Sequence, residues 1–163
     1  METIQVRFLA EFLNELLACE ETSAALSRAA IGRSADDALR LRLETQESEC
    51  RHHARVVRDL IEEMAGEPGP ATASVRTLLG ALEASMVDAG ADPELRRWLD
   101  LQTLVDCATT CQRNWALLGT IGECNGDPAI MRAIDRVGDD ENRHVQSLRD
   151  ALFERTPAVL LAR

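Results

Sequence analysis

Two copies of a Glu-x-x-His pattern could place metal ligands on separate helices of this chain. The first copy provides Glu49 and His52, and the second provides Glu141 and His144. Residues three positions apart lie on one face of an α-helix, so each copy directs a carboxylate and an imidazole at one point. Oxygen and imidazole ligands together suit divalent first-row metals such as iron and manganese. The two copies therefore predict a metal centre between two helices.

The composition predicts one soluble, all-α domain. A chain of 163 residues, 45% of them apolar, can bury a sizeable core in a single domain. Alanine, leucine, glutamate and arginine dominate, whereas glycine and proline fall mostly at a few breaks, which favours helix almost throughout. The formal charge of -10 repels the phosphates of nucleic acids and of anionic lipids. We therefore expect neither a nucleic-acid partner nor a membrane partner.

The N-terminal residues do not resemble an export signal. Glu2, Glu11 and Glu15 interrupt the apolar residues there, and no apolar run in the chain approaches membrane-spanning length. A cytoplasmic location is therefore expected. In that compartment, cysteines without the spacing of a secreted disulfide scaffold should be free thiols. The five cysteines are Cys19, Cys50, Cys107, Cys111 and Cys124.

Apolar residues at three- and four-residue steps predict four long amphipathic helices. These helices span residues 3–31, about 35–65, 93 to about 125, and 128–156. An aspartate followed by proline opens each of the last two helices, at Asp92 and Asp127. Together the helices form one domain, residues 1–156. An apolar C-terminal tail, residues 157–163, follows because Pro157 should stop the last helix. This tail either docks on another subunit or on a partner shell, or frays.

The connections between these helices are predicted to be short, long and short. The first is short because Ser34 and Asp37 form a capping box for the second helix. The second covers residues 66–92 and contains a short helix over 75–86, ended by Gly90. One long connection between two hairpins is a known topology of four-helix bundles that hold metals in their core.

The height of each acidic residue along its helix selects the remaining ligands. Measured from the first turn, Glu20 and Glu49 lie roughly 20 and 24 Å along their helices at 1.5 Å per residue. In the second hairpin, Asp106 and Glu141 differ in height by only ~5 Å. Asp106 is the one acid at that level on the third long helix. The predicted metal ligands are therefore Glu20, Glu49, His52, Asp106, Glu141 and His144, with no catalytic residue expected beyond them.

These motifs resemble the ferritin-like superfamily, in particular bacterioferritins and rubrerythrins. The segment Leu-Asn-Glu-Leu-Leu-Ala-Cys-Glu at residues 13–20 is similar to the first-helix motif of bacterioferritins. The resemblance implies a ferritin-like four-helix bundle with one long crossover containing a short extra helix, and a centre of two iron ions. It implies a terminal ligand at Glu20, bridging ligands at Glu49 and Glu141, and histidine ligands at His52 and His144.

The chain departs from the family pattern at several positions. Cys50 stands where bacterioferritins have the methionine that binds haem, so haem is not expected. Asp106 replaces the usual glutamate, and Ser27 replaces a frequent tyrosine; the chain contains no tyrosine, which excludes a tyrosyl radical. The paired Cys-x-x-Cys motifs of the rubredoxin-like domain are also missing. Electrons would therefore come from another protein or from substrate iron.

The expected function is that of a di-iron or di-manganese carboxylate protein that reacts with O2 or H2O2. It would be an oxidoreductase of ferroxidase or peroxidase type, assembled as a homo-oligomer, a dimer or larger. The first alternative is a thiol-rich bundle that binds copper or zinc, since Cys19, Cys50 and Cys107 adjoin proposed ligands. The others are a di-iron oxygenase acting on a small organic substrate, for which the sequence locates no pocket, and a metal-free structural bundle.

Three conspicuous side chains receive more modest interpretations. His53 is interpreted as an imidazole beside the ligands rather than as a ligand, because no acid on the fourth helix is spared for it. Trp98 and Trp115 are interpreted as core residues rather than electron relays. These interpretations leave the predicted ligand set unchanged.

Overall fold

The computed structural model describes residues 2–64, 66–86 and 92–161. Within these ranges the regular structure is entirely helical, which confirms the predicted all-α class. The helices are α1 (Glu2–Arg33), α2 (Asp37–Met64), α3 (Ala73–Ser85), α4 (Pro93–Asn125), α5 (Pro128–Val137) and α6 (Asp140–Leu161). None of the helices in this described part combines the length and the apolar surface that crossing a bilayer requires.

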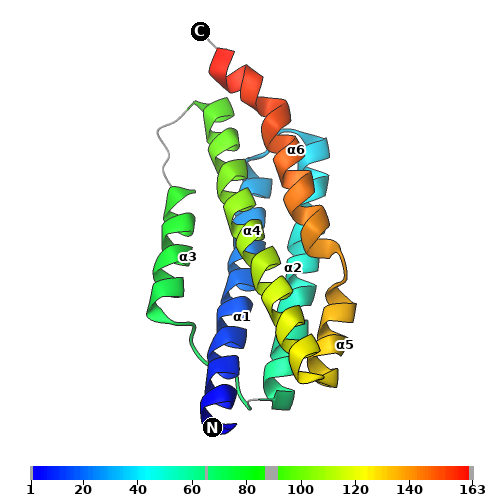
Figure 1. Ribbon diagram of the computed structural model, residues 1–163. Helices are drawn as coiled ribbons and strands as arrows, with labels where there is room; N and C mark the ends of the chain where they lie inside the picture. Colours follow the sequence, from blue (N-terminus) through cyan, green and yellow to red (C-terminus); the bar gives the residue numbers. More distant parts are fainter. Residues whose placement is uncertain (1, 65, 87–91, 162–163) are drawn as a thin grey trace.

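The long helices pack side by side as a bundle of two hairpins (Figure 1). α1 and α2 form the first hairpin, and α4 runs antiparallel to α5 and α6 in the second. α2 and α4 run in the same direction, so the connection that contains α3 must return along the length of the bundle. α3 lies outside the bundle, against α1 and α4. The connections are therefore short, long and short in the structure too.

Aspartate side chains cap the N-termini of three helices. Asp92 and Asp127 each accept hydrogen bonds from two backbone N–H groups in the first turn of α4 and α5, and a proline follows each. Both start signals are therefore confirmed. At α2 the cap differs from the prediction, because Asp36, rather than Ser34, accepts from the backbone N–H groups of Ala38 and Leu39. The predicted end of the short helix at Gly90 lies outside the described residues.

The predicted fourth helix is divided into α5 and α6. Gly138 has φ 56° and ψ -133°, a conformation that side chains with a Cβ rarely adopt, and the chain turns there before Asp140. The predicted stop at Pro157 is also wrong, since α6 continues to Leu161. A proline this close to the helix end removes a single backbone hydrogen bond. The indole of Trp98, which donates to Thr156 Oγ1 at 3.0 Å, ties this end of α6 to α4.

The two larger apolar clusters fill the bundle on either side of a polar layer, and a small third cluster of Cys19, Leu79 and Cys111 packs α3 against α1 and α4. The first cluster surrounds Leu13, Ile61 and Leu118 and includes the buried face of α5. The second surrounds Leu43 and Leu104 and includes the buried face of α6. The polar layer between them consists of the buried residues Glu20, Ser23, Gln46, His53, Asn114, Glu141 and His144.

Candidate metal centre

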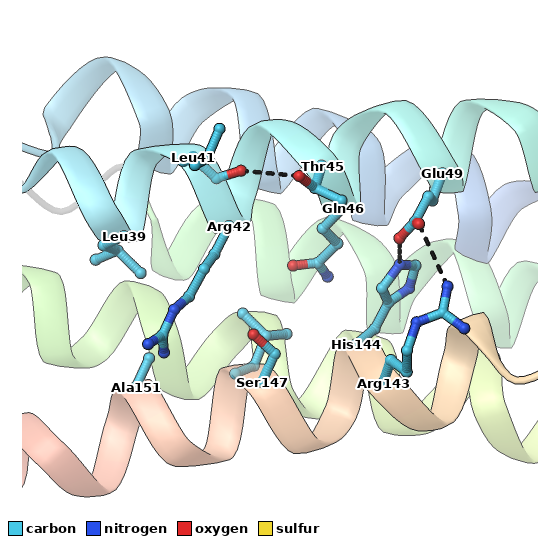
Figure 2. Close-up of a pocket in the computed structure, with 11 residues that line it drawn as sticks. Leu39, Leu41, Arg42, Thr45, Gln46, Glu49, Arg143, His144, Ser147 and Ala151 are labelled. Carbon is cyan, nitrogen blue, oxygen red and sulfur yellow. Dashed lines mark hydrogen bonds and ion pairs between the residues drawn. The ribbon is translucent and has the colours of Figure 1, made fainter.

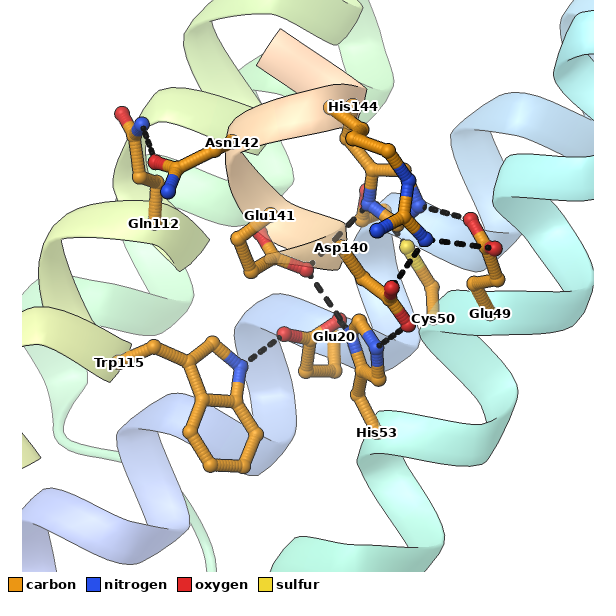
Figure 3. A network of polar contacts seen from close by, with 12 residues as sticks. Glu20, Glu49, Cys50, His53, Gln112, Trp115, Asp140, Glu141, Asn142 and His144 are labelled. Carbon is orange, nitrogen blue, oxygen red and sulfur yellow. Dashed lines mark hydrogen bonds and ion pairs between the residues drawn. The ribbon is translucent and has the colours of Figure 1, made fainter. Parts of the chain in front are cut away.

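His53 lies at the middle of the polar layer and contacts acids from two helices (Figure 3). Its Nδ1 lies 2.9 Å from Glu141 Oε1 and 3.7 Å from Glu20 Oε2. Its Nε2 lies 3.2 Å from Asp140 Oδ2. The ring is fully buried. A single imidazole of α2 therefore links the carboxylates of α1 and α6.

Glu20 is fixed by one strong hydrogen bond and leaves one oxygen free. The indole N–H of Trp115 on α4 donates to Glu20 Oε1 at 2.6 Å (Figure 3). The other oxygen, Oε2, is buried and has no hydrogen-bond partner among the described residues. Buried polar atoms are nearly always paired, so an unpaired carboxylate oxygen suggests a missing partner such as a metal ion.

His144 forms the outer part of the layer together with Glu49. His144 Nε2 lies 2.5 Å from Glu49 Oε2, and His144 Nδ1 lies 3.3 Å from Glu141 Oε1. The second contact lacks hydrogen-bond geometry, which leaves Nδ1 buried and unpaired within the described structure. Arg143 contacts Asp140 and lies 3.5 Å from Glu49 Oε1. Glu49 thus sits at the rim, where 28% of its side chain remains exposed.

The acids of the layer raise the pKa of both histidines. Burial alone would lower the pKa of His53, but the hydrogen bond to Glu141 and the nearby carboxylate of Glu20 outweigh burial and raise the pKa to about 10. The pKa of His144 is likewise raised, because Glu141 and Glu49 oppose the effect of burial. A protonated His53 therefore balances part of the charge of the buried carboxylates. Since a metal binds the neutral imidazole, metal binding at this layer would release protons.

The two central glutamates differ in their ionisation. Burial raises the pKa of Glu20 above its ordinary value, and the nearby Glu141 adds to that effect. Burial acts in the same direction on Glu141, but the nearby imidazole of His144 and the hydrogen bond with His53 reverse this effect and lower the pKa of Glu141. Both carboxylates also lie near the start of α6, whose N-terminal dipole favours negative charge. Glu141 is thus the better-stabilised anion of the pair.

The potential donor atoms form two groups that share Glu141. In the first group His53, Glu141 and His144 each offer one atom, all within 4.8 Å of one another. In the second group Glu20, Cys111 and Glu141 satisfy the same criterion. The unpaired atoms Glu20 Oε2, Glu141 Oε2 and His144 Nδ1 belong to these residues. Hard oxygen and imidazole donors with free lone pairs fit one or two divalent metal ions.

Two of the predicted ligands, His52 and Asp106, lie outside this centre. Both are exposed, and neither belongs to a donor group of the described residues. His52 was predicted from the Glu-x-x-His spacing and Asp106 from its height along the helix. Neither criterion specifies which helix face is buried, and successive residues of an α-helix point about 100° apart. His53 on α2, and Cys107 with Cys111 on α4, occupy the buried directions instead. The structure does bring together Glu20, Glu141 and His144, with Glu49 beside them.

Periodicity would have identified His53 from the sequence. The residues of α2 that face the interior recur at three- and four-residue steps: Leu39, Leu43, Gln46, Cys50, His53, Val57 and Leu60. His53 continues this series and His52 interrupts it. The contacts of Trp115 with Glu20 and of Asp140 with His53 were not predicted. No local pattern indicates them, because each contact depends on how two helices are rotated relative to each other.

Three cysteines line the α1 and α4 side of the centre. Cys19, Cys107 and Cys111 are buried free thiols, as is Cys50 on α2. The Cys107 thiol donates to the backbone oxygen of Cys19 at 3.9 Å. A hydrogen bond from Cys111 lowers the pKa of Cys19, whereas bonds to Cys107 and Cys19 raise the pKa of Cys111. These thiols therefore form a connected group beside Glu20.

The residues of the centre come from four helices. α1 provides Glu20, α2 provides Glu49 and His53, α4 provides Trp115 and Cys111, and α6 provides the remaining donors. The chain matches no known family model, no curated protein and no solved structure.

Proposed function

We propose that this protein is a ferritin-like metal protein whose centre binds iron or manganese and reacts with O2 or H2O2. The observation that carries the proposal is the pair of donor groups that share the buried carboxylate of Glu141. A carboxylate common to two groups is suited to bridge two ions, as in di-iron bundles. The activity would be of ferroxidase or peroxidase type, as the resemblance to ferritin-like proteins implies, and the Glu-x-x-His motif of Glu141 and His144 lies within the centre.

The donors would divide between two positions. His53 and His144 would hold one ion with Glu141, and Glu49 lies within reach of the same position through its contact with His144. Glu20 and Glu141 would hold the other, with Cys111 as the neighbouring donor from α4. A bound iron or manganese pair supplies the redox chemistry.

The protein's own residues orient the donors and limit the access of water. Trp115 fixes Glu20, and Asp140 contacts the far nitrogen of the His53 ring, which leaves Nδ1 facing the carboxylates. The apolar clusters on both sides exclude water from the layer, which strengthens electrostatic interactions within it.

Adjacent histidines provide a matched test of this centre. Protein from iron-supplemented cells should contain up to about two metal ions per chain by elemental analysis. His53→Gln should lower this occupancy, while His52→Gln, which changes an exposed neighbour, should leave it unchanged. Glu141→Gln should lower it most, because Glu141 belongs to both donor groups. Equal occupancy in the His53 and His52 variants would reject the proposed centre.

A thiol-based metal site is the second candidate function, and Cys111 is the observation that favours it. Cys111 contributes to a donor group, and Cys19 and Cys107 lie beside it. Thiolates prefer copper(I) or zinc over the metals that suit carboxylates. A combined Cys19→Ser, Cys107→Ser and Cys111→Ser variant should keep its iron under the first proposal. Purified protein that contains copper or zinc, lost in that variant but kept in Glu141→Gln, would favour the second.

A further inference from the structure

A mainly apolar groove lies between α2 and α6 and reaches the metal centre (Figure 2). Its volume is about 380 Å³, which falls in the size range of small-molecule sites. Leucine and alanine side chains line one end, including Leu39, Leu148 and Ala151. Glu49 and His144 line the other end. A molecule in this groove would therefore contact two residues of the polar layer directly.

Two polar side chains of α2 point into the groove, and neither makes a short hydrogen bond or ion pair with a described residue there. Arg42 crosses it toward Ala151 in Figure 2, and its recorded ion pair, with Glu154, is 4.0 Å long. Gln46 lies one turn further along, is buried, and has an amide nitrogen with no hydrogen-bond partner in the described structure. A guanidinium and an amide N–H2 four residues apart on one helix face are both hydrogen-bond donors. Together they favour an anionic acceptor such as a carboxylate.

The shape of the groove restricts the rest of the ligand. Arg42 and Glu49 are seven residues apart on α2, so the groove runs about 10 Å from the guanidinium end to the metal centre. Most of the surface that lines the groove is apolar, and the polar side chains along that length are Thr45, Gln46 and Ser147. At the far end Glu49 and Arg143 are already engaged with each other and with His144 and Asp140, so no free cation of the described residues lines that end to receive a second carboxylate. The chemistry therefore fits a monocarboxylate with an apolar body, rather than a dicarboxylate or a sugar.

We propose that this groove binds a small monocarboxylate with an apolar body, whose carboxylate contacts Arg42 and Gln46 and whose far end faces Glu49 and His144. The proposal supplies the pocket that an organic substrate of the centre would require. Its second part, that the far end approaches the metal, rests on the function proposed above. Its first part, binding in the groove, does not depend on a metal.

Octanoate is a suitable probe, because it combines a carboxylate with an aliphatic body of about the groove's length. Calorimetric titration of the metal-free full chain should show binding of octanoate at least tenfold tighter than that of octanamide, which lacks the charge. Arg42→Gln should weaken octanoate binding about tenfold, the size expected for a lost ionic hydrogen bond. Ser147→Phe, which fills the groove from α6 at a partly exposed position, should abolish it. Arg40→Gln is the control, since Arg40 lies on α2 outside the groove.

Three results would overturn the binding site: no octanoate binding at millimolar concentration, equal binding of octanamide, or binding that survives Ser147→Phe. A second titration with cobalt(II)-loaded protein tests the approach to the metal. Octanoate should change the visible absorption of cobalt(II) in the wild-type protein and not in Ser147→Phe. An unchanged spectrum with octanoate bound would overturn the second part. Failure to bind cobalt(II) at all would instead count against the proposed function, and the metal-free titration would still decide on the groove.

Discussion

The apolar clusters and the polar layer differ in how completely their buried atoms are satisfied. On either side of the layer, side chains such as Leu104 and Leu118 are fully buried against other apolar groups. Within the layer, oxygens of Glu20 and Glu141 and a nitrogen of His144 are buried without hydrogen-bond partners. An unpaired buried polar group costs about 1–3 kcal/mol. The clusters therefore stabilise the fold, while the layer lowers its stability and offers donors.

This difference suggests that the layer is kept for binding rather than for folding. Functional sites commonly reduce stability, because their groups are arranged for a ligand and not for each other. Substitutions should therefore act in opposite ways in the two regions. Four predictions test that contrast, beginning with the largest effect.

Truncation in either apolar cluster should cost the most stability. Leu118→Ala in the first cluster and Leu104→Ala in the second should each lower the free energy of unfolding by about 3 kcal/mol, because each leaves a cavity in a fully buried region. The two sites are about 21 Å apart along α4, so the double variant should lose about the sum. Chemical denaturation measures all three values. Metal content per folded chain should not change.

The stability of the metal-free protein should fall at alkaline pH through His53. Its folded-state pKa of about 10 exceeds the unfolded value near 6.5, so its contribution is complete below about pH 6.5 and is lost as the pH rises to 10. The loss should be about 2 kcal/mol, because the cost of burying Glu20 offsets part of the gain. Denaturation of His53→Gln across this range should show a flatter profile. The same slope in His53→Gln and His52→Gln would contradict the assignment.

Removal of a buried charge from the layer should stabilise the metal-free protein. Burial raises the pKa of Glu20, and Glu20→Gln resembles the protonated form while keeping the oxygen that accepts from Trp115. The variant should gain about 1 kcal/mol in the absence of metal, because a folded-state pKa above the ordinary value means that ionised Glu20 costs stability at neutral pH. Added iron or manganese should raise the melting temperature of the wild type more than that of the variant. A loss of stability in the metal-free variant would indicate that Glu20 serves the fold.

Substitution of the exposed residues next to the layer should have the smallest effect. His52→Ala and Asp106→Ala should each change the free energy of unfolding by less than about 0.5 kcal/mol, because both side chains face solvent. Metal affinity should stay at the wild-type value, in contrast to what the sequence alone predicts for Asp106. Titration with manganese, followed by calorimetry, compares these variants with His53→Gln. A large loss in Asp106→Ala would restore the original ligand assignment.

The sequence was sufficient for features that depend on neighbouring residues. The caps at Asp92 and Asp127 are local, since each aspartate bonds to N–H groups within the next turn. The position of the site along the helix axes could also be predicted. The chain rises 1.5 Å per residue along a helix, so an error of one residue changes the predicted height very little. Glu20 and Glu141 accordingly lie in one donor group.

The direction in which a side chain points around the helix axis does not tolerate an error of one residue position. One residue changes the height by only 1.5 Å but turns the side chain by about 100°, which separates buried His53 from exposed His52. The division of the last helix at Gly138 was missed because the apolar spacing continues on both sides of it. The groove between α2 and α6 could not be foreseen, since its walls come from helices whose packing no local pattern specifies.

The distribution of the donors over both hairpins has a consequence for the kinetics of folding. Each donor group combines residues of the α1 and α2 hairpin with residues of α4 or α6, so neither hairpin alone contains a complete group. A metal ion can therefore bind tightly only after the hairpins have docked. An interaction that forms after the transition state slows unfolding and leaves the folding rate nearly unchanged. Bound metal should thus slow unfolding and lengthen the lifetime of the folded chain.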